Sequence, residues 1–188
     1  MTDALIAEFW DGEKFVARLS GSHEIVEFDE IDSLSPIMLG NRLPKAIVAK
    51  MAKTLMDPDK YYTHHGFRNA PRRSTIRHNV FSRFSGGASG HLYGGAPQPG
   101  FLEGFTQLKL IIGLYEAGYT ELARDVCIGF CDTNLELMPD FGYRETVPTS
   151  ENKWRPVEAI GFGKCSALSS AIFLVLAGFL ASISKEGE

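Results

Sequence analysis

The sequence lacks the features that mark several large classes of protein. It has only three cysteines among 188 residues, an odd number that excludes a fully paired disulfide framework. Its formal net charge is -4, so it lacks the positive charge with which proteins attract nucleic acid in bulk. Its acidic start has neither the basic residues nor the apolar run of a secretory signal. We therefore expect a protein of the reducing cytoplasm that needs no metal or other cofactor.

Apolar residues are plentiful, at 44% of the sequence, which is enough for one well-packed core. The sequence contains neither a low-complexity tract nor a repeat of fixed period. We expect a single domain over residues 1–188. Its parts would be a hairpin and helix over 1–60, a long loop over 61–100 and helical hairpins over 101–188.

Hydrophobic periodicity predicts an all-α protein. Apolar residues recur at steps of three and four over residues 43–56, 101–115 and 120–137, with Phe105 and Leu135 among those expected to be buried. Gly118 lies in the short link between the last two segments, so we expect these helices to be antiparallel neighbours. Near the N-terminus, Asp11-Gly12 lies between two aromatic-containing pairs and predicts a small β-hairpin.

Residues 164–184 form the most apolar run of the chain, and two interpretations fit it. The run is close to the length of about 20 residues that spans a bilayer. A helix buried inside an all-α protein is equally apolar on every side, and five serines interrupt this one. We favour the buried helix and expect no membrane association.

Residues 61–100 combine many glycines and prolines with six aromatic residues. A loop of that length inside a compact domain is either disordered or functional, and the aromatic content favours function. We expect Tyr61 and Tyr62 to lie near the surface. The segment also contains a basic, histidine-rich set: His64, His65, Arg68, Arg72, Arg73, Arg77, His78 and Arg83.

Three interpretations of this basic set remain open. Its aromatic neighbours would suit a nucleic-acid surface, but the acidity of the chain favours sugar hydroxyls or an anionic sugar group. A solvated loop with ordinary surface ion pairs is the third. A zinc site at His64 and His65 lacks further ligands, as does one at Cys127 and Cys131, which we interpret as core residues.

The segment 137–148 is predicted to be a loop between two apolar helices, and it contains Glu145. A carboxylate beside the aromatic rings of Phe141 and Tyr143 suits glycoside cleavage, because it can deprotonate water while sugar rings stack on flat apolar faces. The alternative is a surface glutamate paired with Arg144 or Lys153.

Several motifs together resemble a known family. They are Phe9-Trp10-Asp11-Gly12, Arg42-Leu43-Pro44, Gly66-Phe67, the loop from Gly94 to Pro99, Gly113-Leu114-Tyr115-Glu116-Ala117-Gly118 and Glu145-Thr146-Val147-Pro148-Thr149. They are similar to (α/α)6-toroid glycoside hydrolases of the processing α-glucosidase and mannosylglycerate-hydrolase type. The resemblance spans most of the chain and matches the C-terminal part of such a toroid.

The resemblance implies a protein that hydrolyses α-linked sugars with inversion, with Glu145 as catalytic base. It implies a sugar site shaped by Tyr61, Tyr62, Phe67, Arg68, Tyr93 and Trp154. The family's Arg-Gly-Pro-Val-Trp loop reads Tyr93-Gly94-Gly95-Ala96-Pro97 here, so its arginine and tryptophan are absent.

The same comparison leaves the mechanism and the ring incomplete. The general-acid aspartate belongs to a part of the toroid before this chain, and Asp140, Glu151 and Glu103 are the internal substitutes. About five or six helices are predicted where a full toroid has twelve. We therefore expect a fragment or partial barrel that self-associates or binds a partner chain completing the ring. The alternative function is a non-catalytic carbohydrate-binding or assembly module.

Overall fold

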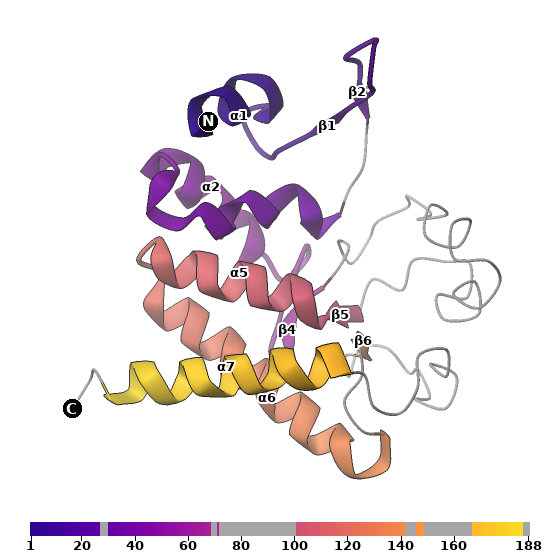
Figure 1. Ribbon diagram of the computed structural model, residues 1–188, viewed down its shortest axis with the longest axis vertical. Helices are drawn as coiled ribbons and strands as arrows, with labels where there is room; N and C mark the ends of the chain where they lie inside the picture. Colours follow the sequence, from indigo (N-terminus) through magenta and orange to yellow (C-terminus); the bar gives the residue numbers. More distant parts are fainter. Residues whose placement is uncertain (27–29, 69–70, 72–100, 142–145, 149–166, 186–188) are drawn as a thin grey trace, which may run out of the picture.

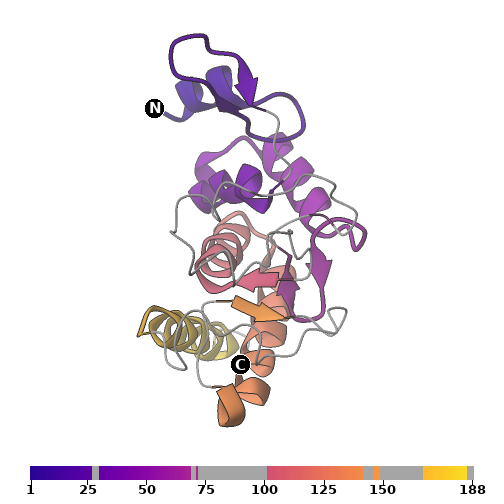
Figure 2. The ribbon, with the colours of Figure 1, turned by 90° about the vertical axis from the view of Figure 1, so that its right-hand side faces the viewer.

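The computed structural model describes residues 1–26, 30–68, 71, 101–141, 146–148 and 167–185. Helices dominate these residues, as the sequence predicts. The helices are α1 (Thr2–Phe9), the 3-10 helix η1 (Ile31–Arg42), α2 (Lys45–Leu55), α5 (Gly104–Glu116), α6 (Thr120–Phe141) and α7 (Ala167–Lys185). α5 and α7 lie side by side, with α6 behind them (Figures 1 and 2).

Short strands form three antiparallel pairs. They are β1 (Ala17–Arg18) with β2 (Ile25–Val26), β3 (Tyr62–Thr63) with β4 (Gly66–Phe67), and β5 (Phe101–Glu103) with β6 (Thr146–Pro148). The first pair is a small hairpin near the N-terminus with its turn at residues 19–24, whereas at the predicted Asp11-Gly12 hairpin Trp10 and Phe15 form an isolated antiparallel bridge. β5 and β6 correct two predictions. The expected helix over 101–115 starts only at Gly104, and within the expected loop over 137–148 the described residues belong to the end of α6 and to β6.

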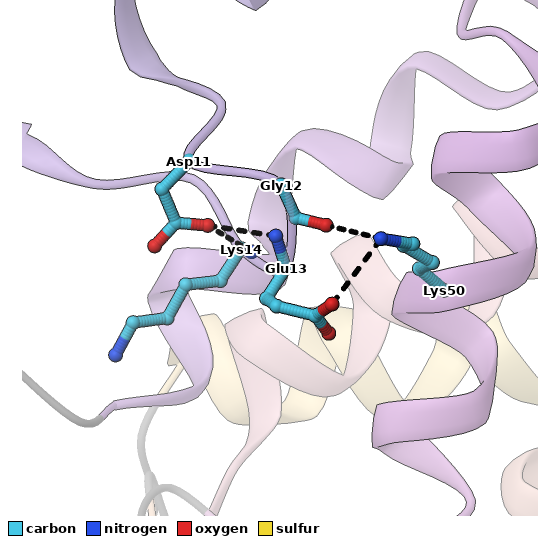
Figure 3. Close-up of polar contacts among 5 residues, drawn as sticks. All are labelled: Asp11, Gly12, Glu13, Lys14 and Lys50. Atoms are coloured by element: carbon cyan, nitrogen blue, oxygen red, sulfur yellow. Dashed lines mark hydrogen bonds and ion pairs between the residues drawn. The ribbon is translucent and has the colours of Figure 1, made fainter.

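The predicted Asp11-Gly12 turn is present and is fixed to α2 (Figure 3). The Asp11 carboxylate accepts hydrogen bonds from the backbone N–H groups of Glu13 and Lys14, both at 2.8 Å. Gly12 has a φ of 108°, which a residue with a Cβ rarely adopts. From α2, the Lys50 ammonium donates to the Gly12 carbonyl at 2.6 Å and to the Glu13 carboxylate at 3.2 Å.

α5 and α6 form the predicted antiparallel hairpin. α5 ends at Glu116, and Gly118 takes a φ of 91° in the link, as expected for a helix C-terminal glycine. The buried side of α5 is made of Leu110, Ile111 and Leu114, each 0% exposed. Phe105 and Leu135 are exceptions to the predicted stripes, since they are 48% and 47% exposed. Both lie on the side of their helix that turns away from the core.

One hydrophobic core joins η1, α2, α5, α6 and α7. Two glycines allow close backbone contact within it. A Cβ on Gly113 of α5 would collide with the Ile37 carbonyl oxygen of η1, and one on Gly129 of α6 would collide with the His64 carbonyl oxygen. Because these neighbours are backbone atoms, they cannot rotate away. Glycine at these positions sets how closely η1 and the β3–β4 hairpin approach the helices.

We therefore expect Gly113→Ala and Gly129→Ala each to lower the free energy of unfolding by about 2 kcal/mol or more, because the added methyl overpacks a rigid contact. Urea denaturation measures the effect. Gly178→Ala is the matched control: its Cβ meets nothing within 4 Å, and alanine stabilises a helix by about 1 kcal/mol relative to glycine. Equal changes in the free energy of unfolding at the three positions would contradict the close contact of Gly113 and Gly129 with the neighbouring backbone.

α7 buries Ile172, Phe173 and Leu176, which are 5%, 8% and 0% exposed. Its opposite side is exposed, so the prediction of a helix buried all round is wrong for this element. None of the described helices combines the length and the apolar character needed to cross a membrane.

Cys127 and Cys131 are buried core residues of α6, as predicted, and both are free thiols. The Cys127 thiol also donates to the Leu176 carbonyl of α7 at 3.6 Å. A hydrogen bond to Cys131 and burial together raise the pKa of Cys127 well above its usual range. The folded pair therefore keeps one proton at a pH where an unfolded chain has released both.

The folded chain holds the proton of the Cys127 thiol more tightly than the unfolded chain does, so the free energy of unfolding depends on pH. The pKa of Cys127 is raised in the folded state, so its contribution is complete below the unfolded pKa of about 8.5 and is lost as pH rises above it. We expect the free energy of unfolding to fall by up to about 1.4 kcal/mol per pH unit above that point. Denaturant titrations at several pH values test this. Cys127→Ala should flatten the slope, and an unchanged slope would contradict the assignment.

Candidate functional site

The predicted sugar-binding residues fall into two groups. Glu145, Tyr93 and Trp154 lie outside the described residues. Tyr61, Tyr62, Phe67 and Arg68 are described, and all four belong to the β3–β4 hairpin or directly flank it. The structure therefore brings this second group together, and the hairpin is where the candidate site is built.

The hairpin itself is a tight four-residue turn. Tyr62 pairs with Phe67, and Thr63 with Gly66, which leaves His64 and His65 at the tip. The Thr63 hydroxyl donates to the Gly66 carbonyl at 2.7 Å and accepts from the His65 N–H at 3.0 Å. These local bonds fix the turn, so the rings it carries are presented from a defined backbone.

Three of the four described residues face inward. Tyr61 and Arg68 are 2% exposed and Phe67 is 0% exposed, so the expectation that Tyr61 lies near the surface is wrong. The Arg68 guanidinium donates to the Pro58 carbonyl at 2.8 Å and the Lys60 carbonyl at 3.4 Å. A buried guanidinium in this position braces the chain entering the hairpin. Sequence composition could not reveal this, since arginine is rarely buried.

Tyr62 and His64 form the accessible part of the hairpin. The Tyr62 side chain is half-buried and His64 is exposed. Their ring centroids are 6.2 Å apart at an interplanar angle of 72°, and Tyr62 makes a similar edge contact with Phe67 at 6.5 Å. The buried Phe67 thus supports a ring pair that reaches solvent, an arrangement able to contact an apolar sugar face.

His65 ties the hairpin tip to α6. Its Nδ1 lies 2.8 Å from the Thr133 hydroxyl, and that hydroxyl donates to the Gly129 carbonyl at 2.7 Å. A hydroxyl has one proton to give, so the Nδ1 of His65 is the donor in the first bond. The same turn of α6 contains Gly129, whose missing side chain admits the His64 carbonyl. Neither histidine belongs to a group of three or more possible metal ligands within the described part of the chain.

A buried glutamine, absent from the sequence-based site, holds the other side of the hairpin. Gln107 of α5 is 0% exposed. Its Oε1 accepts from the Phe67 N–H at 2.8 Å, and its Nε2 donates to the Phe67 carbonyl at 2.7 Å. The side-chain amide occupies the position of one more strand beside β4. A polar residue inside the apolar stripe of α5 was the signal that could have revealed it.

We expect Gln107→Leu to lower the free energy of unfolding by about 2–4 kcal/mol, because both the N–H and the carbonyl of Phe67 lose their partner in a buried setting. Native-state hydrogen exchange should show a faster Phe67 amide together with the global loss in denaturant. Lys109→Leu is the control on the same helix, since it removes an ion pair with Asp32 and a cation–π contact with Phe105 but leaves both bonds to the Phe67 backbone in place. An unchanged Phe67 amide in Gln107→Leu would contradict the clamp.

The β5–β6 pair lies at the same end of the helices as this hairpin, and both views place β4 next to it (Figures 1 and 2). In its register Glu103 faces Thr146, and Phe101 faces Pro148. Glu145 directly precedes Thr146 in the sequence. The strand ends therefore gather two sequence-predicted regions, the aromatic hairpin and the segment after Glu145, at one end of the helical layers.

Helical hairpins stacked in two layers, with short strands at one end, are typical of an α/α toroid. No protein-family model matches the sequence, and a sequence search of curated proteins finds no match. Among solved structures, the chain is similar to neutral trehalase Nth1 from Saccharomyces cerevisiae, an (α/α)6-toroid glycoside hydrolase, with a TM-score of 0.64 and 12% identity. The similarity covers 98% of this chain but 30% of the trehalase. It confirms the expected fold, which is part of an α/α toroid.

Proposed function

We propose that the chain is a glycoside hydrolase-like protein that acts on α-linked sugars with inversion, as a partial toroid formed by one domain over residues 1–188. The observation that supports this most is the toroid fold, shared with a trehalase despite 12% identity. The free thiols of Cys127 and Cys131 suit a reducing cytoplasm. Fold alone does not define an activity, so the residues at the strand end of the helices carry the rest of the proposal.

In this proposal Glu145 is the general base that deprotonates the attacking water. Its support comes from its place in the chain, directly before β6 and therefore tied to the end of the molecule where the half-buried Tyr62 ring and the exposed His64 ring lie. Tyr62 contacts the sugar from the hairpin, and Tyr93 and Trp154 contribute from the neighbouring segments. Tyr61, Phe67 and Arg68 act from beneath, since their burial suits them to hold the backbone of the site.

An inverting hydrolase needs a second carboxyl group about 6.5–9.5 Å from the base, to protonate the leaving oxygen. Glu103 has the best support among the internal candidates, because its Cα pairs with that of Thr146, the residue after Glu145. Asp140 lies in the last turn of α6, and Glu151 lies outside the described residues. A partner chain that completes the ring is the other source of this acid.

We expect Glu145→Gln to lower turnover by at least about 10³-fold, because the amide cannot take a proton from water. The assay uses a panel of α-linked disaccharides, including trehalose, and glycosyl glycerates. Proton NMR of the first-formed product anomer tests inversion. Glu136→Gln, an exposed glutamate on α6, is the matched control and should retain full activity. Equal turnover by Glu145→Gln and the parent would remove Glu145 from the mechanism.

Glu103→Gln separates the internal acid from an external one. If Glu103 protonates the leaving group, the variant should lose activity on substrates with poor leaving groups and keep most of it on activated aryl glycosides, whose leaving groups need little protonation. If Glu103→Gln lowers the activity by the same factor on both kinds of substrate, or leaves both unchanged, the acid must be another residue or belong to another chain.

A non-catalytic carbohydrate-binding or assembly module is the second candidate. It is favoured by the Tyr62 and His64 rings of the hairpin, which can contact a sugar face without a catalytic carboxylate. Calorimetric titration with the same sugars distinguishes the two functions. A binding module retains affinity that Tyr62→Ala reduces, and it shows no turnover in any preparation.

A further inference from the structure

The side of the molecule formed by α5 and α7 exposes apolar residues across both helices. On α7, Leu174 and Val175 are 67% and 53% exposed, and on α5 Phe105 is 48% exposed. Leu108 and Ile112 are half-buried between them on the same side of α5. An edge contact between the Tyr115 and Phe179 rings, 5.0 Å apart, joins the two helices. The surface they share is hereafter called the α5–α7 face, and in Figure 1 these two helices lie side by side in front of α6.

α6 lies behind these helices (Figure 2), and its exposed residues are of a different kind. Over residues 120–136 its exposed residues are Thr120, Glu121, Arg124, Asp125, Ile128, Asp132, Leu135 and Glu136. Five of these eight are charged, as expected of a helix facing water. The corresponding exposed positions of α7 are Ala171, Leu174, Val175, Gly178, Ala181 and Ser182, none of which is charged. Water suits the outer side of α6, whereas the α5–α7 face has the composition of a contact surface.

We propose that the α5–α7 face binds a second copy of this chain, with the two α7 helices antiparallel across a two-fold axis. A two-fold interface must be complementary to itself. With the axis at the level of Leu176, Leu174 of one copy lies opposite Gly178 of the other, and Ala171 lies opposite Ala181. A Cβ at Gly178 would meet nothing within 4 Å, so there is room above it for the leucine.

Electrostatics favour the same arrangement. The only charged residue of α7 is Lys185, its last residue, so pairing brings no like charges together within the stripe. Antiparallel helices also place opposite ends of their dipoles side by side. On α5, Lys109 lies beside the face. Its ammonium pairs with the Asp32 carboxylate at 3.1 Å and lies 5.2 Å from the centroid of the Phe105 ring.

The size of the face indicates how strong the association should be. At a rise of about 1.5 Å per residue, the helices are roughly 20 and 28 Å long, and side by side they give a face of roughly 500 Å² in projection. That is at the lower end of specific interfaces, which bury about 800 Å² of accessible surface per partner. We therefore expect a reversible dimer that dissociates in the micromolar range.

Sedimentation velocity of the 188-residue chain across the micromolar range tests the proposal. We expect a monomer–dimer equilibrium. Leu174→Glu should raise its dissociation constant by roughly tenfold or more, since a carboxylate would be desolvated at the centre of the contact. Leu174 is mostly exposed, so the variant should fold, which circular dichroism checks.

Gly178→Leu is the sharper variant, because it separates specific pairing from general stickiness. It adds apolar surface and should stabilise the helix, so non-specific association would become stronger. In the proposed dimer it fills the space that Leu174 of the other copy occupies, and association should become roughly tenfold weaker. Ile128→Glu on α6, at an exposed position outside the face, is the control and should leave the equilibrium unchanged.

Two results would overturn the proposal. One is a parent chain that stays monomeric at every concentration, which would leave the face to the helices of another polypeptide. The other is a dimer that Leu174→Glu and Gly178→Leu do not weaken, which would place the contact elsewhere. Neither result bears on sugar hydrolysis, which is measured separately.

Discussion

The contact between one side-chain amide and one residue's backbone holds the candidate site together. Gln107 satisfies both the N–H and the carbonyl of Phe67 from inside the core, at 2.8 and 2.7 Å. A two-stranded hairpin is marginally stable alone, and β3–β4 has only two residues in each strand. The Gln107 amide makes the two hydrogen bonds to β4 that the backbone of a third strand would make. The half-buried Tyr62 ring and the exposed His64 ring therefore have a fixed position relative to α5, and through α5 to β5.

A second anchor acts from α6, and it combines a missing side chain with a hydrogen bond. Gly129 lets the carbonyl of His64 approach the helix, while Thr133, one turn further on, accepts from the His65 ring. The hairpin is thus held between two helices that themselves form an antiparallel pair. Movement of α5 against α6 would be felt directly at the aromatic rings, so rigidity of the helical layers is what gives the site a defined shape.

The parts of the fold that could be predicted from sequence depend on local signals. Gly118 ended α5 because a left-handed position favours glycine, and Asp11-Gly12 made its turn for the same reason. β5 and β6 were missed because each is three residues long and gains its identity only from a partner far away in the chain. Phe105 and Leu135 were assigned to the core because periodicity defines an apolar stripe without saying which edge of it meets another helix.

The candidate site shows the same division. Aromatic and basic composition drew attention to the segment around Tyr62, but residue type alone could not distinguish the half-buried Tyr62 and exposed His64 from the buried Tyr61 and Arg68. Which of these side chains reaches solvent is decided by the alternation of sides along the strand and by the packing of Phe67 in the core. Gln107 escaped notice because a glutamine in a helix is ordinarily a surface residue. Its role exists only once β4 lies beside α5.

The exposed α5–α7 face leaves apolar surface in contact with water after the helices have packed. Leu174 and Val175 of α7 are 67% and 53% exposed, and Phe105 of α5 is 48% exposed, so contact with another apolar surface would remove them from water. α6 has no such need, since its outer side is charged. Folding of this segment therefore does not remove all of its apolar surface from water. The remaining apolar surface is available for association, and pairing of two α7 helices is the arrangement that we propose would bury it.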